Sequence, residues 1–288
     1  MDSELRTYRT TGDKHLDEPL SAIGGKGLFT KELEADLARG TVDCCVHSLK
    51  DLPTEMPAGL EIAALLPRED PRDALVVNAV TGASSLAELP RGSRVGTSSL
   101  RRRAQLLALR SDLEVVELRG NVPTRVRKVD VGQVHAAILA AAGLHRLGIA
   151  QHIASYLDAP AWLPAAGQGA IAVQIRSDDE KMRAVLSRLD HPETALEVRA
   201  ERAFLGALEG GCQVPIGALA MSTNGARVLH GFIADVQGRR MVRGSHAIDA
   251  DNPELGGIRL ANELRTAGAT EILAGLRSVQ RIPSPQPE

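Results

Sequence analysis

The stretch RVGTSSLRRR (residues 94–103) predicts a β-strand that passes directly into an α-helix. The strand is expected over residues 94–97 and the helix over 99–109. The first turn of a helix leaves backbone N–H groups unpaired and carries the positive end of the helix dipole. The turn also holds three hydroxyl residues and two arginines: Thr97, Ser98, Ser99, Arg101 and Arg102. This combination predicts an anion-binding site, with a capped helix and solvated arginines as the alternative.

Outward from this stretch, helical and extended segments alternate between about residues 31 and 163. Strands are expected at 42–47, 60–66, 74–78, 113–118 and 136–140. Helices are expected at 31–38 and 122–129, with a helical turn at 141–147. This alternation is typical of an α/β architecture with mostly parallel strands.

The C-terminal part of the sequence has a different pattern. One more strand is expected at 170–175, followed by helices at 179–189 and 193–208. Three strands at 214–221, 227–235 and 241–247 then predict an antiparallel sheet, with the last two joined around Gln237 and Gly238. Helices at 254–267 and 270–278 are expected to cover this sheet.

The composition is that of a globular protein of two or three domains, with 288 residues of which 43% are hydrophobic and 24% charged. The net charge of −2 gives no general attraction to nucleic acid or to a membrane. Three cysteines form neither a disulfide framework nor a metal-ligand pattern. The first residues lack the apolar core of a signal peptide, and no apolar run could span a bilayer. We therefore expect a cytoplasmic protein without a metal.

Arginines follow two further strands of the predicted sheet. The segment LRGNVPTRVRK (residues 118–128) places Arg119 and Arg125 after one strand, and Arg146 follows the next. In open α/β sheets, ligands bind at the carboxyl ends of the strands. Arginines at three successive strand ends predict a ligand with several negative groups, because one carboxylate needs only one guanidinium fork.

Two other segments contain candidate reactive groups. In HSLKDLP (residues 47–53), Lys50 and Asp51 follow a buried strand, and a carboxylate in a basic cleft stays ionised and stabilises a developing positive charge. A surface ion pair before a proline turn is the alternative. In EGGCQVPIG (residues 209–217), Cys212 has glycine on one side and glutamine on the other, which indicates a displayed thiol. An ordinary turn explains the same pattern.

Several long motifs in order resemble the porphobilinogen deaminase family, also called hydroxymethylbilane synthase. They are TGD (11–13), GGKGLF (24–29), HSLKDLP (47–53), VGTSSLRR (95–102), LRGNV (118–122), LPAAGQGA (163–170), EVRAER (197–202) and EGGCQVPIG (209–217). The resemblance covers nearly the whole chain.

This resemblance implies that Cys212 carries a dipyrromethane cofactor through a thioether. The cofactor would prime the stepwise addition of four porphobilinogen molecules with loss of ammonia, before hydrolysis releases hydroxymethylbilane. Asp51 matches the catalytic aspartate, which would stabilise cationic intermediates. The acetate and propionate groups of cofactor and growing chain would be bound by Lys50, Thr97, Ser98, Ser99, Arg101, Arg102, Arg119, Arg125, Arg146 and Gln168.

The family fold implies two periplasmic-binding-protein-like α/β domains and a smaller α+β domain with the cysteine loop and a three-stranded antiparallel sheet. Domain 1 would comprise residues 1–68 and 167–187, domain 2 residues 70–164, and domain 3 residues 189–288. The family usually acts as a monomer, so a monomer is expected here, with porphobilinogen and the growing polypyrrole as its partners.

One departure from the family pattern concerns the beginning of the chain. The family normally starts with a strand and helix carrying an Arg-x-Ser segment, and this sequence starts about one such unit later. A truncated, inactive deaminase is therefore one alternative, and a small-anion binding protein with the same fold is another. Nucleic-acid binding by the arginines is a third alternative, but the sequence has no net positive charge, no recognised nucleic-acid-binding motif and no interleaved aromatic residues.

Overall fold

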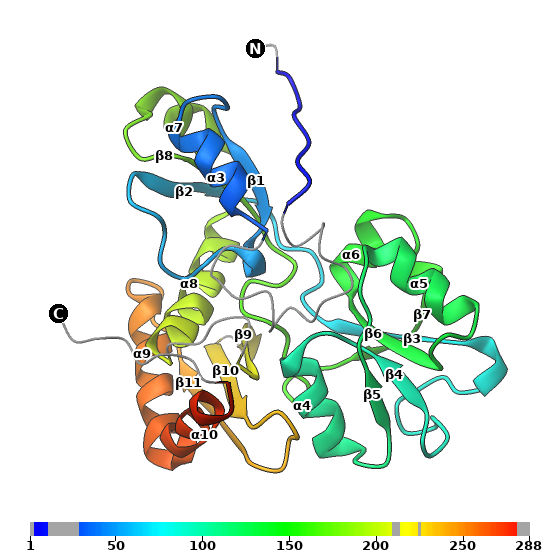
Figure 1. Ribbon diagram of the computed structural model, residues 1–288. Coiled ribbons are helices and arrows are strands. Elements are labelled where there is room, and N and C mark those ends of the chain that lie inside the picture. The colour runs from blue at the N-terminus through cyan, green and yellow to red at the C-terminus, as the bar shows by residue number, and fades with distance from the viewer. Residues whose placement is uncertain (1–2, 11–28, 209–213, 224–225, 281–288) are drawn as a thin grey trace. The chain divides into compact units, whose positions relative to one another are not determined.

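The computed structural model describes residues 3–10, 29–208, 214–223 and 226–280 (Figure 1). The chain divides into two compact units. The first unit comprises Met1–Arg68 and Ala170–Ala195, and the second comprises Glu69–Gly169 and Leu196–Glu288. The predicted division into three domains is finer than this and stays a prediction.

The first unit is built on a three-stranded sheet in the order β1 (Cys45–Ser48), β8 (Ile171–Arg176), β2 (Leu60–Leu65). The central strand β8 runs antiparallel to both neighbours. Helix α3 (Lys31–Ala38) packs Leu37 against Cys45 on one face. Helix α7 (Glu180–Leu186) packs Leu186 against Val173 on the other face. The strand order places the turn after β1 beside the start of β8.

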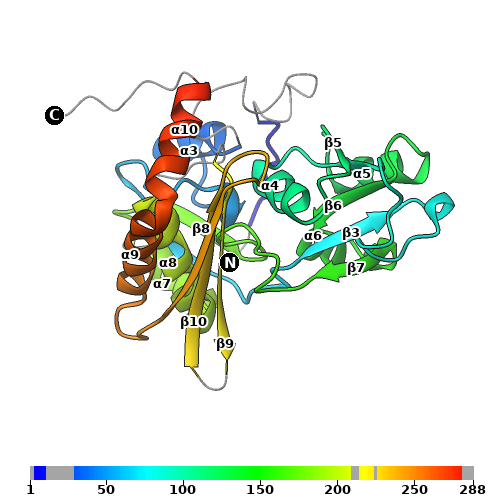
Figure 2. The ribbon, with the colours of Figure 1, turned by 90° about the horizontal axis from the view of Figure 1, so that it is seen from below.

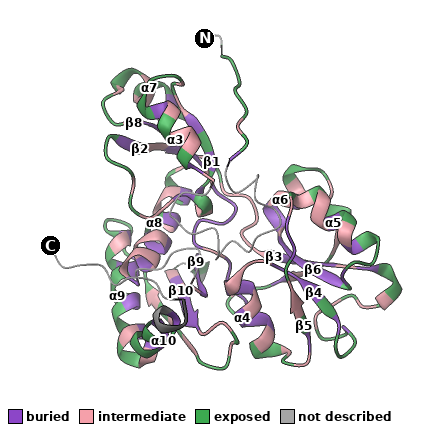
Figure 3. Ribbon diagram, in the orientation of Figure 1, coloured by how far each residue is buried: buried purple, intermediate pink, exposed green. Residues whose placement is uncertain are grey.

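The larger sheet of the second unit has five strands. Their order is β5 (Glu114–Val116), β4 (Arg94–Gly96), β6 (Ala136–Ala140), β3 (Asp73–Val77) and β7 (Ile153–Leu157). Strand β4 is parallel to β5 and to β6, whereas β3 is antiparallel to β6 and to β7. Residues 136–139 of β6 are buried, as expected for a strand covered on both faces (Figure 3).

Helices cover both faces of this five-stranded sheet. Helix α4 (Leu100–Leu109) places Leu106 in the core on one face. Helix α5 (Val122–Asp130) and the short α6 (Ala141–Arg146) contribute Val126 and Leu144 to the core on the other. The helices that join β4 to β5 and β5 to β6 make these strands parallel.

The second unit also contains an antiparallel sheet in the order β11 (Met241–Ala247), β10 (Ala226–Ala234), β9 (Ile216–Thr223). Helix α8 (Pro192–Ala207), which enters this unit at Leu196, and helix α9 (Pro253–Leu264) lie on the same side of β10 (Figure 2). Together with α10 (Thr270–Gln280) they form one apolar core with the sheet. A wider helical turn, Arg265–Ala269, joins α9 to α10 and contains Gly268 with φ 113°.

The structure confirms the mixed α/β class and the three-stranded antiparallel sheet, and it corrects one expectation. Strands in the α/β sheets are not mostly parallel among the described residues, because β3 and β8 run against their neighbours. Strands β2 and β3 belong to different sheets, as do β7 and β8, so neither β3 nor β8 is reached by a strand–helix–strand crossover within its own sheet. Strand β7 was not predicted, and its residues are only partly buried at this edge.

Helices α8 and α9 approach closely at Gly257, which gives a stability prediction. A Cβ at this position would lie 2.7 Å from the backbone nitrogen of Phe204. Gly275 in α10 has no atom within 4 Å of the same position. Both glycines are helical, so alanine improves helix propensity by about 1 kcal/mol in each case.

Gly257→Ala is therefore expected to lower the free energy of unfolding by about 1–3 kcal/mol, since the helices must separate. Gly275→Ala is the matched control and should be neutral or slightly stabilising. Calorimetric melting of both variants checks this. Equal effects of the two substitutions would contradict the close packing of α8 on α9.

No helix within residues 29–208, 214–223 or 226–280 is long and apolar enough to cross a membrane.

Candidate functional site

Three parallel strand ends meet at one edge of the five-stranded sheet, as the sequence predicts. Because β4 lies between β5 and β6 and is parallel to both, the carboxyl ends of all three point the same way. Thr97 directly follows β4, and Arg119 lies three residues beyond β5. Arg146 is the last residue of α6, which follows β6. We call this edge of the sheet, together with the first turn of α4, the arginine edge.

The turn between β4 and α4 is fixed by its own hydroxyl groups. Ser99 caps α4 by accepting a hydrogen bond from the backbone N–H of Arg102 at 3.4 Å. Thr97 Oγ1 accepts from the N–H of Ser99 at 3.2 Å, and Ser98 Oγ donates to the carbonyl of Leu118 at 2.8 Å. The three hydroxyl groups therefore shape the turn and tie it to the segment after β5.

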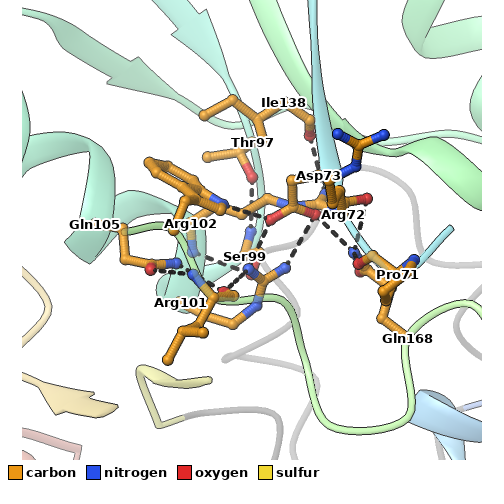
Figure 4. Close-up of polar contacts among 12 residues, drawn as sticks. Pro71, Arg72, Asp73, Thr97, Ser99, Arg101, Arg102, Gln105, Ile138 and Gln168 are labelled. Carbon is orange, nitrogen blue, oxygen red and sulfur yellow. Dashed lines mark hydrogen bonds and ion pairs between the residues drawn. The ribbon is translucent and has the colours of Figure 1, made fainter. Parts of the chain in front are cut away.

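The guanidinium groups of Arg101 and Arg102 turn inward, to a carboxylate that sequence reasoning missed. Asp73, the first residue of β3, is fully buried and accepts from Arg101 NH1 at 2.6 Å and from Arg102 NH2 at 2.7 Å. Trp162 Nε1 donates to its Oδ2 at 2.7 Å, and Gln168 Nε2 donates to its Oδ1 at 2.9 Å. Figure 4 shows the contacts of Asp73 with Arg101, Arg102 and Gln168. We call these five residues the Asp73 cluster.

Other donors of the two arginines bind backbone carbonyl groups. Arg101 NH1 also donates to Leu163 O at 2.7 Å, and Arg102 NH1 donates to Ile138 O at 2.9 Å. Arg101 and Arg102 are only 5% and 6% exposed. Their binding of substrate carboxylates stays a prediction, and the structure adds a role in holding α4 against β3 and β6.

Electrostatics keep the Asp73 cluster ionised. Burial alone would raise the pKa of Asp73, but the charges and hydrogen bonds of Arg101 and Arg102 outweigh it and hold that pKa well below its usual range. Burial lowers the pKa of Arg101, yet an arginine starts so high that it stays charged. One carboxylate thus faces two buried guanidinium groups.

The segment after β5 positions two more predicted arginines. Asn121 caps α5 by accepting from the N–H of Thr124 at 3.0 Å. Arg125 Nε donates to Gly120 O at 2.7 Å, and Lys128 Nζ donates to Arg119 O at 3.1 Å. Arg119 is 8% exposed. Both arginines therefore stay close to the turn at the end of β5.

Arg146 and Gln168 lie near the segment where the second unit leads into β8. Arg146 NH2 donates to the carbonyl of Gly169 at 2.7 Å, and the same carbonyl accepts from the N–H of Glu69 at 3.1 Å. The amide of Gln168, besides contacting Asp73, donates to Pro71 O at 2.8 Å and is 1% exposed. Gln168 is therefore a buried residue that holds the Asp73 carboxylate and the segment before β3 in place.

Lys50 and Asp51 belong to the first unit. They form a 3₁₀ turn, Leu49–Asp51, directly after β1, and Asp51 is exposed. The turn is held by the N–H of Leu49, which donates to Ala170 O at 3.0 Å. Upstream in β1, the buried His47 shares a hydrogen bond of 3.1 Å with Gln174. Burial lowers the pKa of His47 and favours its neutral form.

Cys212 lies outside the described residues, whereas the other two cysteines are in the first unit. Cys45 is buried, and burial raises its pKa to about 11. Burial also raises the pKa of Cys44. The thiolate is the reactive form, so neither thiol suits nucleophilic chemistry near neutral pH.

Cys45 is therefore expected to resist alkylation in the native protein. At pH 8 a thiol with this pKa contains about 100-fold less thiolate than an ordinary cysteine, and labelling should increase as the pH approaches 11. Timed iodoacetamide labelling with peptide mapping measures the rate, and the same reaction in denaturant is the control. Equal rates in native and denatured protein would contradict the buried position.

Across the ranges that the structure describes, no group of three or more His, Cys, Asp or Glu side chains is arranged to hold a metal ion. The donors of the arginine edge are guanidinium, hydroxyl and backbone N–H groups, which suit carboxylates. The fold and this edge define an α/β protein with an arginine-lined candidate site for an anion.

Comparison with known proteins specifies the family. A model described as "Porphobilinogen deaminase, dipyromethane cofactor binding domain" matches residues 1–184, and one described as "Porphobilinogen deaminase, C-terminal domain" matches residues 195–266. The chain belongs to the porphobilinogen deaminase family.

Curated relatives agree with this assignment. The porphobilinogen deaminase of Geobacter sulfurreducens is 50% identical over 274 residues, which cover 95% of this chain and 85% of the relative. That of Moorella thermoacetica is 50% identical over 278 residues, which cover 96% and 88%. Among solved structures, a periplasmic sulfonate-binding protein from Methylobacillus flagellatus aligns at 15% identity over 62% of this chain and 52% of its own. The TM-score of this alignment is 0.34.

Proposed function

We propose that this chain catalyses the porphobilinogen deaminase reaction. Four porphobilinogen molecules are joined head to tail, one ammonia is lost at each addition, and water releases hydroxymethylbilane. Membership of the family over nearly the whole chain is the observation that carries this proposal. The arginine edge supports it, because each pyrrole brings two carboxylates.

Dipyrromethane is the cofactor that the family model names. Its acetate and propionate groups fit an edge where guanidinium and hydroxyl groups gather after β4, β5 and β6. When bound, it supplies the pyrrole carbon to which the first porphobilinogen is joined. We propose Cys212 as its attachment point, because its EGGCQVPIG motif resembles the cofactor-bearing segment of the family. The raised pKa values of Cys44 and Cys45 agree with this, since neither has the chemistry of an exposed thiolate.

The chain's own residues bind the carboxylates of the pyrroles and stabilise the charge that develops during the reaction. The side chains of the arginine edge hold carboxylates and orient the pyrroles, which reduces the entropy lost on the way to the transition state. Asp51 is proposed to stabilise the positive charge that develops as ammonia leaves, since it is exposed on a turn fixed to Ala170, the residue before β8. Lys50, beside it, is proposed to bind a carboxylate.

We also propose that the protein works as a cytoplasmic monomer without nucleic-acid or membrane partners. Its net charge of −2 and its free cysteines Cys44 and Cys45 support this. The molar mass of the purified chain, measured by light scattering, tests whether it is a monomer.

The test of the activity is stoichiometric turnover by this 288-residue chain. Ehrlich detection of pyrroles and an ammonia assay should show four porphobilinogen molecules consumed and four ammonia molecules formed for each hydroxymethylbilane. Binding of porphobilinogen without its consumption would contradict the proposal. That result is what a binding protein or an inactive deaminase would give.

A further inference from the structure

The Asp73 cluster joins segments that are far apart in the sequence but support the same turn. Asp73 opens β3, Arg101 and Arg102 are in the first turn of α4, and Trp162 and Gln168 lie between β7 and β8. The carboxylate receives a second, longer bond from Arg101 NH2 at 3.3 Å and one from Arg102 Nε at 3.1 Å. The first turn of α4 is thereby fixed to the first residue of β3.

The cluster is also unbalanced in charge. Asp73 offers one negative charge to two guanidinium groups that are both almost completely buried. The three groups together therefore carry one excess positive charge. A buried charge without an opposite partner is unfavourable, so an arriving carboxylate improves the electrostatics of the cluster.

Not all donors of the two arginines are used within the described part of the chain. The six hydrogen bonds described above involve both groups, and a guanidinium group has five N–H donors. Donors therefore remain on arginines whose orientation is already fixed. A preorganised donor binds a ligand without losing further side-chain entropy.

We propose that Asp73 is the positioning residue of the arginine edge: it fixes Arg101 and Arg102 and leaves one positive charge for a substrate carboxylate. The inference rests on the proposed function for the identity of the ligand, but its geometry is independent of turnover. Trp162 reports on the cluster because it is the only tryptophan in the sequence and its indole N–H contacts the Asp73 carboxylate.

The central variant is Asp73→Asn, which keeps the shape of the side chain but removes its charge. The matched control is Asp112→Asn. Asp112 accepts from Arg110 Nε and NH2 at 2.8 Å each, just beyond the opposite end of α4. Both substitutions remove a carboxylate that accepts from arginine, two arginines for Asp73 and one for Asp112, but only Asp73 acts at the arginine edge.

Steady-state kinetics of the holoenzymes separate positioning from a merely structural role. A positioning role predicts that Asp73→Asn raises KM for porphobilinogen about tenfold or more, whereas Asp112→Asn leaves it unchanged. A merely structural role would lower only the active fraction, and so the apparent kcat, with KM unchanged. An unchanged KM in folded Asp73→Asn protein would overturn the proposal.

Fluorescence gives a second measurement that does not need turnover. Porphobilinogen added to the wild-type holoenzyme is expected to change the emission of Trp162 in a saturable way. The concentration at half-change should rise about tenfold or more in Asp73→Asn and stay constant in Asp112→Asn. Binding without turnover by the wild type would reject the proposed function while leaving the role of Asp73 supported.

Two further results cover the case in which Asp73→Asn does not fold or does not retain the cofactor. Trp162→Phe removes one donor to Asp73 but keeps all charges, so it should fold and raise KM by about two- to fivefold. If Trp162→Phe leaves KM at the wild-type value, the proposal is overturned. If Asp73→Asn folds by circular dichroism but has the mass of the bare polypeptide, while Asp112→Asn carries the cofactor, the proposal is supported.

Discussion

Replacing Asp51 by asparagine is expected to lower kcat for porphobilinogen by about 100- to 1,000-fold. The substitution keeps the size of the side chain but removes the charge that would stabilise the transition state. Because the positive charge develops only as ammonia leaves, KM should change little. Asp51 is exposed on the 3₁₀ turn after β1, so the fold should tolerate the change.

Asp43→Asn is a suitable control for this prediction. Asp43 is another exposed carboxylate of the first unit, 3.8 Å from Arg176 and 75% exposed. An exposed ion pair of this kind contributes little to stability. Its loss should leave kcat and KM at the wild-type values. If both variants turn over equally fast, Asp51 is not the catalytic carboxylate.

Replacing Cys212 by alanine is expected to abolish activity, because the proposed thioether to dipyrromethane can no longer form. The variant should have the mass of the bare polypeptide. Cys44→Ala is the matched control: Cys44 is a half-buried thiol in the first unit whose pKa is raised by burial, and its removal should leave the adduct in place. Turnover by Cys212→Ala at the wild-type rate would exclude it as the attachment point.

The arginine edge could be predicted from the sequence because its strands belong to strand–helix–strand units. In such units the helix between two strands makes them parallel, so residues after β4 and β5 must lie at one edge. Local residues also explain the caps, since Ser99 and Asn121 each accept from a backbone N–H group three residues further on, although only a cap before α4 was considered from the sequence. These features depend on short stretches of chain.

Features that depend on distant residues could not be predicted. The carboxylate of Asp73 lies 28 residues before Arg101 in the sequence, and nothing in the pattern of either segment pairs them. Arginines are usually exposed, so the inward direction of Arg101 and Arg102 was not expected. The one available signal was a charged residue at the start of the buried strand β3.

The directions of β3 and β8 also depend on distant parts of the chain and could not be predicted. Each strand could be recognised from its apolar residues, but its direction depends on the connection that leads to it. The segments that lead into β3 and β8 each come from a strand of the other sheet, so no crossover from a neighbouring strand sets their directions. The role of Asp51 likewise came from the resemblance, because Lys50 and Asp51 alone could equally form a surface ion pair.

The most direct test of the central claim, a covalently held pyrrole primer that grows in this protein, is an intact-mass measurement. The chain is produced in cells that make porphobilinogen and is measured before and after addition of that substrate. The account predicts a mass above that of the polypeptide by two pyrrole units, and then further species that each contain one more pyrrole unit. The bare polypeptide mass, unchanged by porphobilinogen, would contradict it.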